Sequence, residues 1–391
     1  MINFINKQTE RGNYVLLIMS IILAKSIAYL LRLFPFIILN KKKKKDILFL
    51  PYYPKDNAGC IIRFQNYLPF FSEENISYDI SYIGDHDNLF NLMVGKMSKK
   101  NAYIIYRKIL WKRFFNVINS KNYGAVYVQR CVYPMYSDLK ECFLGKLLYK
   151  LNNNITIDFY DADYTSNESL VISSANLSHK ISVVNKFLES YFRKLDKKIF
   201  IHPISLDKTF YKPKTSYKTH GDIKIVWCGT NGHFKNLRLL DDVFLKLSKN
   251  FNFKLVVISH ENYEIKNVNV ENIKFKLEEF TNTLFNCDIA VFPVKYVDDS
   301  HRGGMAMKAL EYSATGLPTV ATPVGLSPFY KENDDLLIAN TKDEWYDHLS
   351  NLIQNEKLRK NFGENIYQKF LNHHTVENSY KNLKKILNIT S

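Results

Sequence analysis

Two series of short apolar runs, separated by helical patterns, constrain the fold of this chain more than any other feature. The first series lies at residues 47–50, 78–83, 125–129, 155–160, 181–184 and 199–201. The second series lies at residues 223–228, 254–259, 273–275, 288–292 and 319–321. Strands that alternate with helices predict a largely parallel sheet, because a helix carries the chain back to the start of each new strand. The sequence therefore predicts an α/β protein with two Rossmann-like, doubly wound domains that face a cleft.

The length of the chain also favours two domains. At 391 residues it exceeds the size of one ordinary hydrophobic core. The polar stretch 205–221 contains Pro213 and several lysines, and it has the composition of a linker. We expect a membrane-associated segment at 1–45, a first domain at 46–205, a second domain at 206–370 and a closing helical segment at 371–391.

The net charge of +16 favours anionic partners, although part of it follows from a composition rich in Lys, Asn and Ile. No helix-turn-helix, zinc-ligand or RNP-like pattern accompanies the charge, so nucleic acid is not an expected partner. The five cysteines form no CxxC pair, which argues against a disulfide framework and against a zinc site. Buried thiols in a reducing, cytosolic setting are the simpler interpretation of Cys60, Cys131, Cys142, Cys228 and Cys287.

An apolar segment at residues 14–39 is long enough to cross a bilayer. Lys25 and Arg32 share one narrow helical face with Tyr29, so a crossing helix would place two charges in hydrocarbon. A helix that lies in the membrane interface avoids this cost, and the lysines at 41–45 add attraction to an anionic leaflet. A transmembrane helix and a soluble helix packed on the protein are the alternatives. In either membrane arrangement, the lysines keep the body of the protein on the cytoplasmic face.

The most informative stretch surrounds a predicted helix at residues 304–315. The strand before it ends at Pro293, and a loop then leads to Arg302, Gly303 and Gly304. A glycine pair at the start of a helix exposes backbone N–H groups and the positive end of the helix dipole. Ligands of doubly wound folds bind at the carboxyl ends of the strands. This segment therefore predicts a binding site for a diphosphate.

On that predicted helix, Gly304, Lys308 and Glu311 are spaced so that they share one face. An ionised carboxylate accepts two hydrogen bonds at once, so Glu311 suits the two hydroxyls of a ribose, and Lys308 suits a phosphate. An ordinary surface ion pair between Lys308 and Glu311 is the alternative.

Residues 308–320, KALEYSATGLPTV, resemble the donor-site signature K-x-L-E-Y/A-x-A-x-G-x-P-x-V of glycosyltransferase family 4, whose members have the GT-B fold. Segments 227–230 and 235–237 resemble the family's opening of the second domain, and segment 202–207 resembles its connection between domains. Weaker likenesses in the first domain are found at Gly59, Arg63, 128–130 and 158–163. The resemblance covers roughly residues 46–390.

The resemblance implies a retaining hexosyl transfer from a nucleotide sugar to a glycan acceptor, without a cofactor or an obligatory metal. A polyprenyl-linked acceptor would explain the N-terminal helix, the net charge and the arginines together. The resemblance implies a setting in bacterial surface-polysaccharide assembly at the cytoplasmic face of the membrane. It also implies that the C-terminal helix returns to the first domain. The expected catalytic residues are Lys235 and Arg302, which stabilise the departing diphosphate, and Asp161, which orients the acceptor hydroxyl or the transferred sugar.

The same resemblance assigns the two substrates to the two domains. The expected donor residues are Gly229, Thr230, Lys235, Pro293, Arg302, Gly303, Gly304, Lys308 and Glu311. The expected acceptor residues are Gly59, Arg63, Arg130 and Asp163, with the two arginines as ligands of an acceptor phosphate. An Asx-rich turn is the alternative for Asp161 and Asp163.

Two departures from the family pattern leave a second function open. Many members have a glutamate at the position of Gly303, and several have an arginine at the position of Thr230. We expect Arg302 to replace that arginine, the alternative being a solvated loop charge. A non-catalytic GT-B-like scaffold in a polysaccharide-assembly complex is the alternative function.

Overall fold

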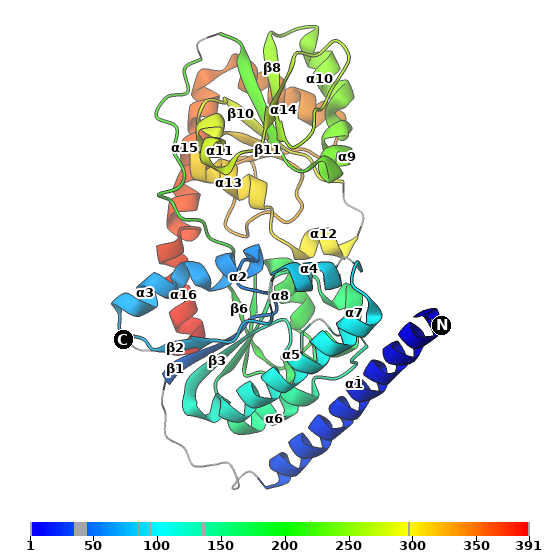
Figure 1. The fold of residues 1–391 in the computed structure, drawn as a ribbon. Helices are drawn as coiled ribbons and strands as arrows, with labels where there is room; N and C mark the ends of the chain where they lie inside the picture. The colour runs from blue at the N-terminus through cyan, green and yellow to red at the C-terminus, as the bar shows by residue number, and fades with distance from the viewer. Residues whose placement is uncertain are drawn as a thin grey trace. The chain divides into compact units, whose positions relative to one another are not determined.

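The chain divides into two compact units, the first formed by Met1–His202 with Tyr380–Ser391 and the second by Pro203–Ser379. The computed structural model describes residues 2–34, 45–84, 86–93, 95–134, 136, 138–219, 221–295 and 298–389. Each unit holds one six-stranded parallel sheet with helices packed against it (Figure 1). The α/β class with two Rossmann-like sheets is therefore confirmed.

The sheet of the first unit has the strand order β2-β1-β3-β4-β5-β6. Its strands are β1 (Lys45–Leu50), β2 (Tyr78–Ile80), β3 (Tyr123–Gln129), β4 (Ile155–Phe159), β5 (Lys180–Val183) and β6 (Lys198–Ile201). All six overlap the apolar runs predicted as strands. The register places Leu50 beside Val128, and Gln129 beside Asp158. The loops after β1, β3 and β4 therefore begin at the same edge of the sheet, where ligands of such folds bind.

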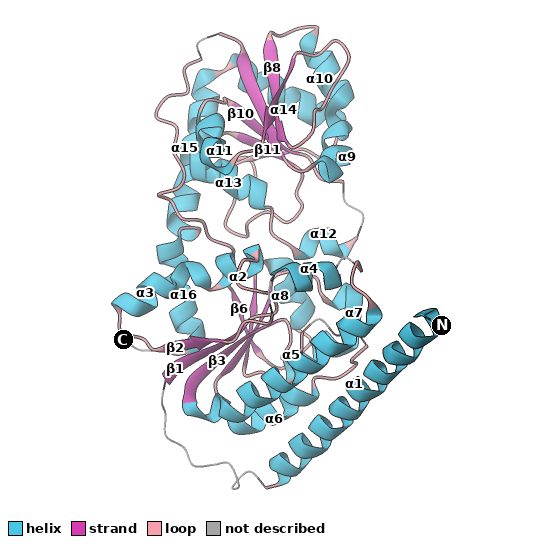
Figure 2. Ribbon diagram, in the orientation of Figure 1, coloured by secondary structure: helices cyan, strands magenta, loops and turns pink. Residues whose placement is uncertain are grey.

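The remaining elements of the first unit are mainly helices that flank this sheet (Figure 2). They are α2 (Ala58–Arg63), α3 (Leu68–Glu73), α4 (His86–Met93), α5 (Lys99–Asn119), α6 (Phe143–Leu151), α7 (Tyr164–Asn176), α8 (Lys186–Phe192) and the 3-10 turns η2 (Gln65–Tyr67) and η3 (Ser120–Asn122). The closing helix α16 (Val376–Leu387) joins this unit from Tyr380 onward. Lys180 Nζ donates to the carbonyl of Ile386 over 2.6 Å, which ties the end of α16 to β5.

The N-terminal helix α1 (Ile2–Leu33) packs against α5 and α6 (Figure 1). Leu17, Ile21, Ala24 and Ala28 recur at helical spacing and are buried on this side. Lys25 forms an ion pair of 3.2 Å with Glu141. Ten large apolar side chains of the segment stay exposed, namely Tyr14, Val15, Leu16, Met19, Ile22, Leu23, Tyr29, Leu30, Leu33 and Phe34.

By length and composition, α1 could also cross a membrane. Residues 35–40 and four of the five predicted lysines, at 41–44, lie outside the described residues.

The sheet of the second unit has the strand order β12-β11-β10-β7-β8-β9. Its strands are β7 (Ile223–Cys228), β8 (Phe253–Ser259), β9 (Val270–Lys274), β10 (Ile289–Phe292), β11 (Thr319–Ala321) and β12 (Leu337–Ile338). The first five overlap predicted strands, and the sequence prediction missed β12. Neighbouring strands are parallel throughout.

Helices flank this second sheet as well (Figure 2). They are α9 (Phe234–Leu237), α10 (Asp241–Ser248), α11 (Leu277–Phe285), α12 (Asp299–Gly303), α13 (Met307–Thr315), α14 (Lys342–Gln354) and α15 (Glu356–His373), with the 3-10 turns η4 (Asn231–His233) and η5 (Arg238–Leu240). The apolar face predicted from residue 236 onward is buried in the core, although the chain forms it from α9, η5 and α10 rather than from one helix.

Candidate functional site

A basic pocket opens in the second unit at the carboxyl ends of β7 and β10. It has a volume of about 370 Å³. It is lined by Trp227, His233, Lys235, Asn236, Phe292, Pro293, Val294, His301, Met305, Ala306, Met307 and Lys308. Two lysines and two histidines in one concave site favour a phosphate-bearing ligand.

A second, more apolar pocket of about 230 Å³ adjoins the first. Its lining residues are Cys228, Gly229, Thr230, Ile258, His260, Phe275, Phe280, Met307, Lys308 and Glu311. Met307 and Lys308 belong to both pockets, so the two are contiguous. Apolar walls beside a carboxylate suit a nucleoside, because the faces of the base are apolar and the ribose hydroxyls donate hydrogen bonds.

Gly229 allows the end of β7 to approach α13. A Cβ atom at this position would lie 2.5 Å from the Trp227 ring and 3.1 Å from Cε of Lys308. The backbone N–H of Cys228 donates to the hydroxyl of Tyr312 over 3.0 Å, which fixes α13 against β7. These contacts hold Lys308 directly over the end of the strand.

Glu311 lies three residues after Lys308 on α13, and both side chains line the apolar pocket. Burial raises the pKa of the Glu311 carboxyl to about 7, and the positive charge of Lys308 opposes this rise. A perturbed carboxyl group in a pocket is a common sign of a ligand site.

The predicted start of this helix is wrong. α13 begins at Met307 rather than at Gly304, and Gly303 ends the separate short helix α12. Gly304 itself has an extended backbone, with φ −82° and ψ 178°. The glycine pair therefore does not form a helix N-terminus, and Gly304 does not share a helical face with Lys308.

The residues expected to bind the diphosphate in the loop before α13 do not line the pockets. Arg302, Gly303 and Gly304 are not among the lining residues of either pocket, whereas His301 lines the basic one. Nδ1 of His301 lies 3.2 Å from a carboxylate oxygen of Asp298. Thus six of the nine expected donor residues meet at the two pockets: Gly229, Thr230, Lys235, Pro293, Lys308 and Glu311.

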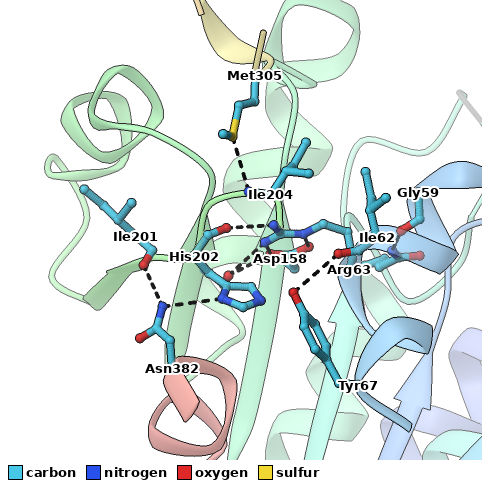
Figure 3. Close-up of polar contacts among 12 residues, drawn as sticks. Gly59, Ile62, Arg63, Tyr67, Asp158, Ile201, His202, Ile204, Met305 and Asn382 are labelled. Atoms are coloured by element: carbon cyan, nitrogen blue, oxygen red, sulfur yellow. Dashed lines mark hydrogen bonds and ion pairs between the residues drawn. The ribbon is translucent and has the colours of Figure 1, made fainter. Parts of the chain in front are cut away.

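In the first unit, the predicted phosphate ligand Arg63 is fully buried. Figure 3 shows its contacts with Asp158 and His202. Its guanidinium donates to both carboxylate oxygens of Asp158, over 2.9 and 2.6 Å, and to the carbonyl of His202 over 2.7 Å. The assignment of Arg63 to the acceptor is therefore corrected, because its donors are used inside the fold.

Gly59 also has a packing role. A Cβ atom at this position would lie 2.4 Å from the hydroxyl of Tyr160, and the carbonyl of Gly59 accepts a hydrogen bond from Gln129. Only a residue without a side chain fits here, so the glycine is explained without a ligand.

The other three first-unit residues come together at the ends of β3 and β4. Arg130 forms ion pairs with Asp161 and, over 2.7 Å, with Asp163. Its guanidinium also lies 4.5 Å from the centre of the Tyr160 ring. Burial raises the pKa of Asp163 to about 7, and it raises the pKa of Asp161 as well, in both cases against the pull of Arg130.

Several lining residues escaped sequence reasoning. The sequence predicted no binding role for His233, His301, Phe275 or Phe280, although each lines one of the two pockets. His233, Phe275 and Phe280 follow the ends of β7 and β9 by a few residues, which is the one signal the sequence offered for them. His301 lies within α12, farther from the end of β10.

Residues 222–355 match a protein-family model described as Glycosyl transferases group 1. Among curated protein sequences, none matches this chain. A glycosyltransferase structure from Rickettsia africae is 15% identical with a TM-score of 0.63, and the match covers 89% of this chain and 100% of that chain. Anabaena HepE in complex with UDP and glucose is 10% identical with a TM-score of 0.60, over 88% and 100% of the two chains.

A sucrose-phosphate synthase from Thermosynechococcus elongatus is 8% identical with a TM-score of 0.58, over 88% and 98% of the two chains. At such identities these structures establish the fold, which is GT-B. The segment that matches the family model includes all the residues that line both pockets of the second unit. Residues 222–355 are thus similar to group 1 glycosyl transferases, and the chain as a whole has the GT-B fold.

Proposed function

We propose that this chain transfers a hexose, with retention of anomeric configuration, from a nucleoside diphosphate sugar to a lipid-linked glycan. The observation that carries the proposal is the pair of contiguous pockets around Lys308. The basic pocket receives the diphosphate, and the apolar pocket receives the nucleoside with Glu311 at its ribose. Uridine diphosphate is the first candidate, because Anabaena HepE was solved with UDP and with UDP-glucose.

The protein's own cations stabilise the departing diphosphate. Negative charge grows on the leaving group as the sugar bond breaks, and fixed positive groups lower the energy of that state. Lys235, Lys308 and His301 line the pocket in which this charge would develop. Because these residues supply the compensating charge, the reaction needs no obligatory metal.

The acceptor binds in the first unit, where Arg130, Asp161 and Asp163 meet at the carboxyl ends of β3 and β4. Asp161 is half-exposed and orients the hydroxyl that receives the sugar. Helix α1 holds this unit at the cytoplasmic face of the membrane, where a lipid-linked acceptor is concentrated. Assembly of a bacterial surface polysaccharide is the setting that these features fit.

A thermal-shift screen tests the donor assignment. The full-length protein in detergent is heated with UDP, GDP, ADP or CMP at millimolar concentration, because a ligand that binds only the folded state raises its melting temperature. We expect one nucleoside diphosphate to stabilise the wild type, and Glu311→Ala to abolish that shift. The matched control is Glu278→Ala, because Glu278 is exposed on α11 and lines neither pocket.

If no nucleotide shifts the wild type, the proposed function fails, and the non-catalytic scaffold becomes the better description. If Glu278→Ala abolishes the shift as completely as Glu311→Ala, the assignment of the apolar pocket to the nucleoside fails.

A further inference from the structure

The first unit contains a pocket of its own beside the cluster of Arg130, Asp161 and Asp163. Its volume is about 190 Å³. Its walls come from the loops after β1 and β3 and from α7. The residues that line it are Tyr52, Arg130, Cys131, Tyr133, Tyr136, Asp163, Ser166, Asn167, Leu170 and Val171. The pocket thus lies at the strand edge where a ligand of the first unit is expected.

Arg130 gives this pocket no surplus of positive charge. Its guanidinium is paired with Asp161 and with Asp163, so two carboxyl groups face one cation. The rings of Tyr52 and Tyr53 lie 5.4 and 5.2 Å from the guanidinium and cover it further. An incoming phosphate would meet a cation whose charge is already compensated by two carboxyl groups, which disfavours an anion.

The walls are aromatic and aliphatic. Tyr133 and Tyr136 stack with ring centroids 5.8 Å apart, and Leu170 and Val171 complete the apolar surface. The Tyr133 hydroxyl donates to the carbonyl of Tyr106 over 2.9 Å, which holds its ring in place. Rigid tyrosine rings provide a flat surface on which the C–H face of a sugar ring can stack. Polar protein groups are then needed at the edge of the sugar ring, where its hydroxyls lie.

Two residues that line the pocket have polar atoms without partners. Nε of Arg130 and Oδ2 of Asp163 are buried and make no hydrogen bond within the described part of the chain. An unsatisfied buried polar group is costly, and such exceptions point to a missing partner. Sugar hydroxyls both donate and accept, so one ring with several hydroxyls serves the carboxylate and the guanidinium together.

The backbone around the pocket is also distorted. Arg130 has a φ of +59°, a left-handed conformation that a residue with a side chain rarely adopts. α7 is interrupted at Asn167, whose φ of −155° and ψ of 80° are not helical. Strained backbone persists where the surrounding structure fixes it, and it gathers at ligand sites.

We propose that this pocket binds a neutral hexopyranose residue of the acceptor, and that it does not bind a prenyl phosphate. The inference rests on the proposed function and narrows it: the chain extends an existing glycan instead of adding the first sugar to a lipid phosphate. The ring stacks on Tyr133 and Tyr136, and its hydroxyls pair with Asp163 and Arg130.

Ligand-observed NMR on the full-length protein in detergent, with UDP present, tests this assignment. The probes are a panel of neutral methyl hexopyranosides and, separately, farnesyl phosphate. The test variants are Tyr136→Leu, which removes one stacking face, and Asp163→Asn, which keeps the shape of the carboxyl group but removes its charge. The control is Tyr191→Leu, because Tyr191 stacks on Tyr164 in the same unit and lines no part of the pocket.

We expect at least one hexopyranoside to bind the wild type and Tyr191→Leu, and its affinity to fall by about tenfold or more in both test variants. UDP binding in the second unit should be unchanged in all of them. The inference would be overturned if the wild type bound farnesyl phosphate and Asp163→Asn or Tyr136→Leu bound it more weakly. A wild type that binds UDP but no hexopyranoside at tens of millimolar would also overturn it. A wild type that binds no nucleotide would instead refute the proposed function, which keeps the two failures distinguishable.

Discussion

Arg63 and Asp158 form a two-pronged ion pair in which both side chains are fully buried, although 95 residues separate them in the chain. Removing one partner of such a pair leaves an uncompensated charge in the interior, which costs about 3–5 kcal/mol. We therefore predict that Asp158→Ala destabilises the first unit by about this amount. Hydrogen–deuterium exchange of peptides from β4 and from β8 would show whether the loss is confined to the first unit.

A matched control for this prediction is Glu168→Gln, which removes the exposed partner of Lys194 in the same unit. Exposed ion pairs contribute little to the free energy of unfolding. We therefore expect hydrogen–deuterium exchange of the β4 peptides in Glu168→Gln to stay close to that of the wild type. Equal effects of the two substitutions would contradict a structural role of Arg63.

The affinity for UDP should depend on the charge of Glu311. Burial raises the pKa of its carboxyl to about 7, and the ionised form is the one that accepts hydrogen bonds from both ribose hydroxyls. Binding should therefore weaken as the pH falls from about 8 to about 6, across the raised pKa. Isothermal titration calorimetry of the wild type and of Glu311→Gln would measure this, and the variant should bind weakly without that dependence.

The raised pKa of Glu311 should also affect the stability of the unliganded protein, with the opposite dependence on pH. A carboxyl whose pKa is raised on folding contributes stability below its unfolded value of about 4.3, and that contribution is lost as the pH rises through the folded value of about 7. Glu311→Gln should thus melt at a higher temperature than the wild type at about pH 8 without nucleotide. A variant that melts lower there would show that Glu311 is stabilised by partners in the fold.

His301 should recognise the second phosphate of the donor. It lines the basic pocket and is held by Asp298, whereas Arg302 is not among the lining residues. A hydrogen bond to a charged group contributes about 1.5–3 kcal/mol, so His301→Gln should weaken UDP binding by roughly tenfold to a hundredfold. UMP lacks that phosphate, so the affinity for UMP should change little in His301→Gln.

Calorimetric titrations of UDP and UMP into His301→Gln and Arg302→Gln would separate the two residues. If Arg302→Gln lost the preference for UDP while His301→Gln kept it, the arginine expected from the sequence would be the functional one.

Eleven of the twelve strands could be predicted because each overlaps a short run rich in apolar residues. β12 contains only Leu337 and Ile338, which is too short to form a pattern.

The prediction of a helix start at Gly304 was wrong for another reason. A glycine pair before a helical pattern suggests a helix start, but α12 ends at Gly303 and the chain then extends through Gly304. The sequence predicted a loop before Gly304, so the short helix α12 was missed.

The roles of the arginines depend on partners far away in the chain. The sequence assigned both Arg63 and Arg130 to an acceptor phosphate, yet Arg63 pairs with Asp158 in the interior while Arg130 pairs with Asp161 and Asp163 at a pocket. Burial is a property of the assembled sheet, so a single sequence does not reveal it. Glu311, by contrast, was found from the spacing of a helix and a family signature.

Helix α1 should lie along the membrane surface and not cross it. Leu17, Ile21 and Ala24 are buried against the rest of the first unit, so one face of the helix is unavailable to lipid. A crossing helix would expose all its faces to hydrocarbon or to a membrane partner. The exposed side chains of Met19 and Ile22 belong to the surface that is free to enter the interface.

Flotation with vesicles that contain anionic lipid would test this arrangement. Burying one large apolar side chain contributes about 1.5–3 kcal/mol, so the double substitution Met19→Ser with Ile22→Ser should lower the partition coefficient by about a hundredfold or more. The control is Leu239→Ser, which changes an exposed apolar residue of the second unit and should float like the wild type. Alkaline carbonate should release the wild type from the vesicles, because an interfacial helix is held less firmly than a spanning one. If the protein stayed on the vesicles after that treatment, α1 would have left the first unit to cross the bilayer.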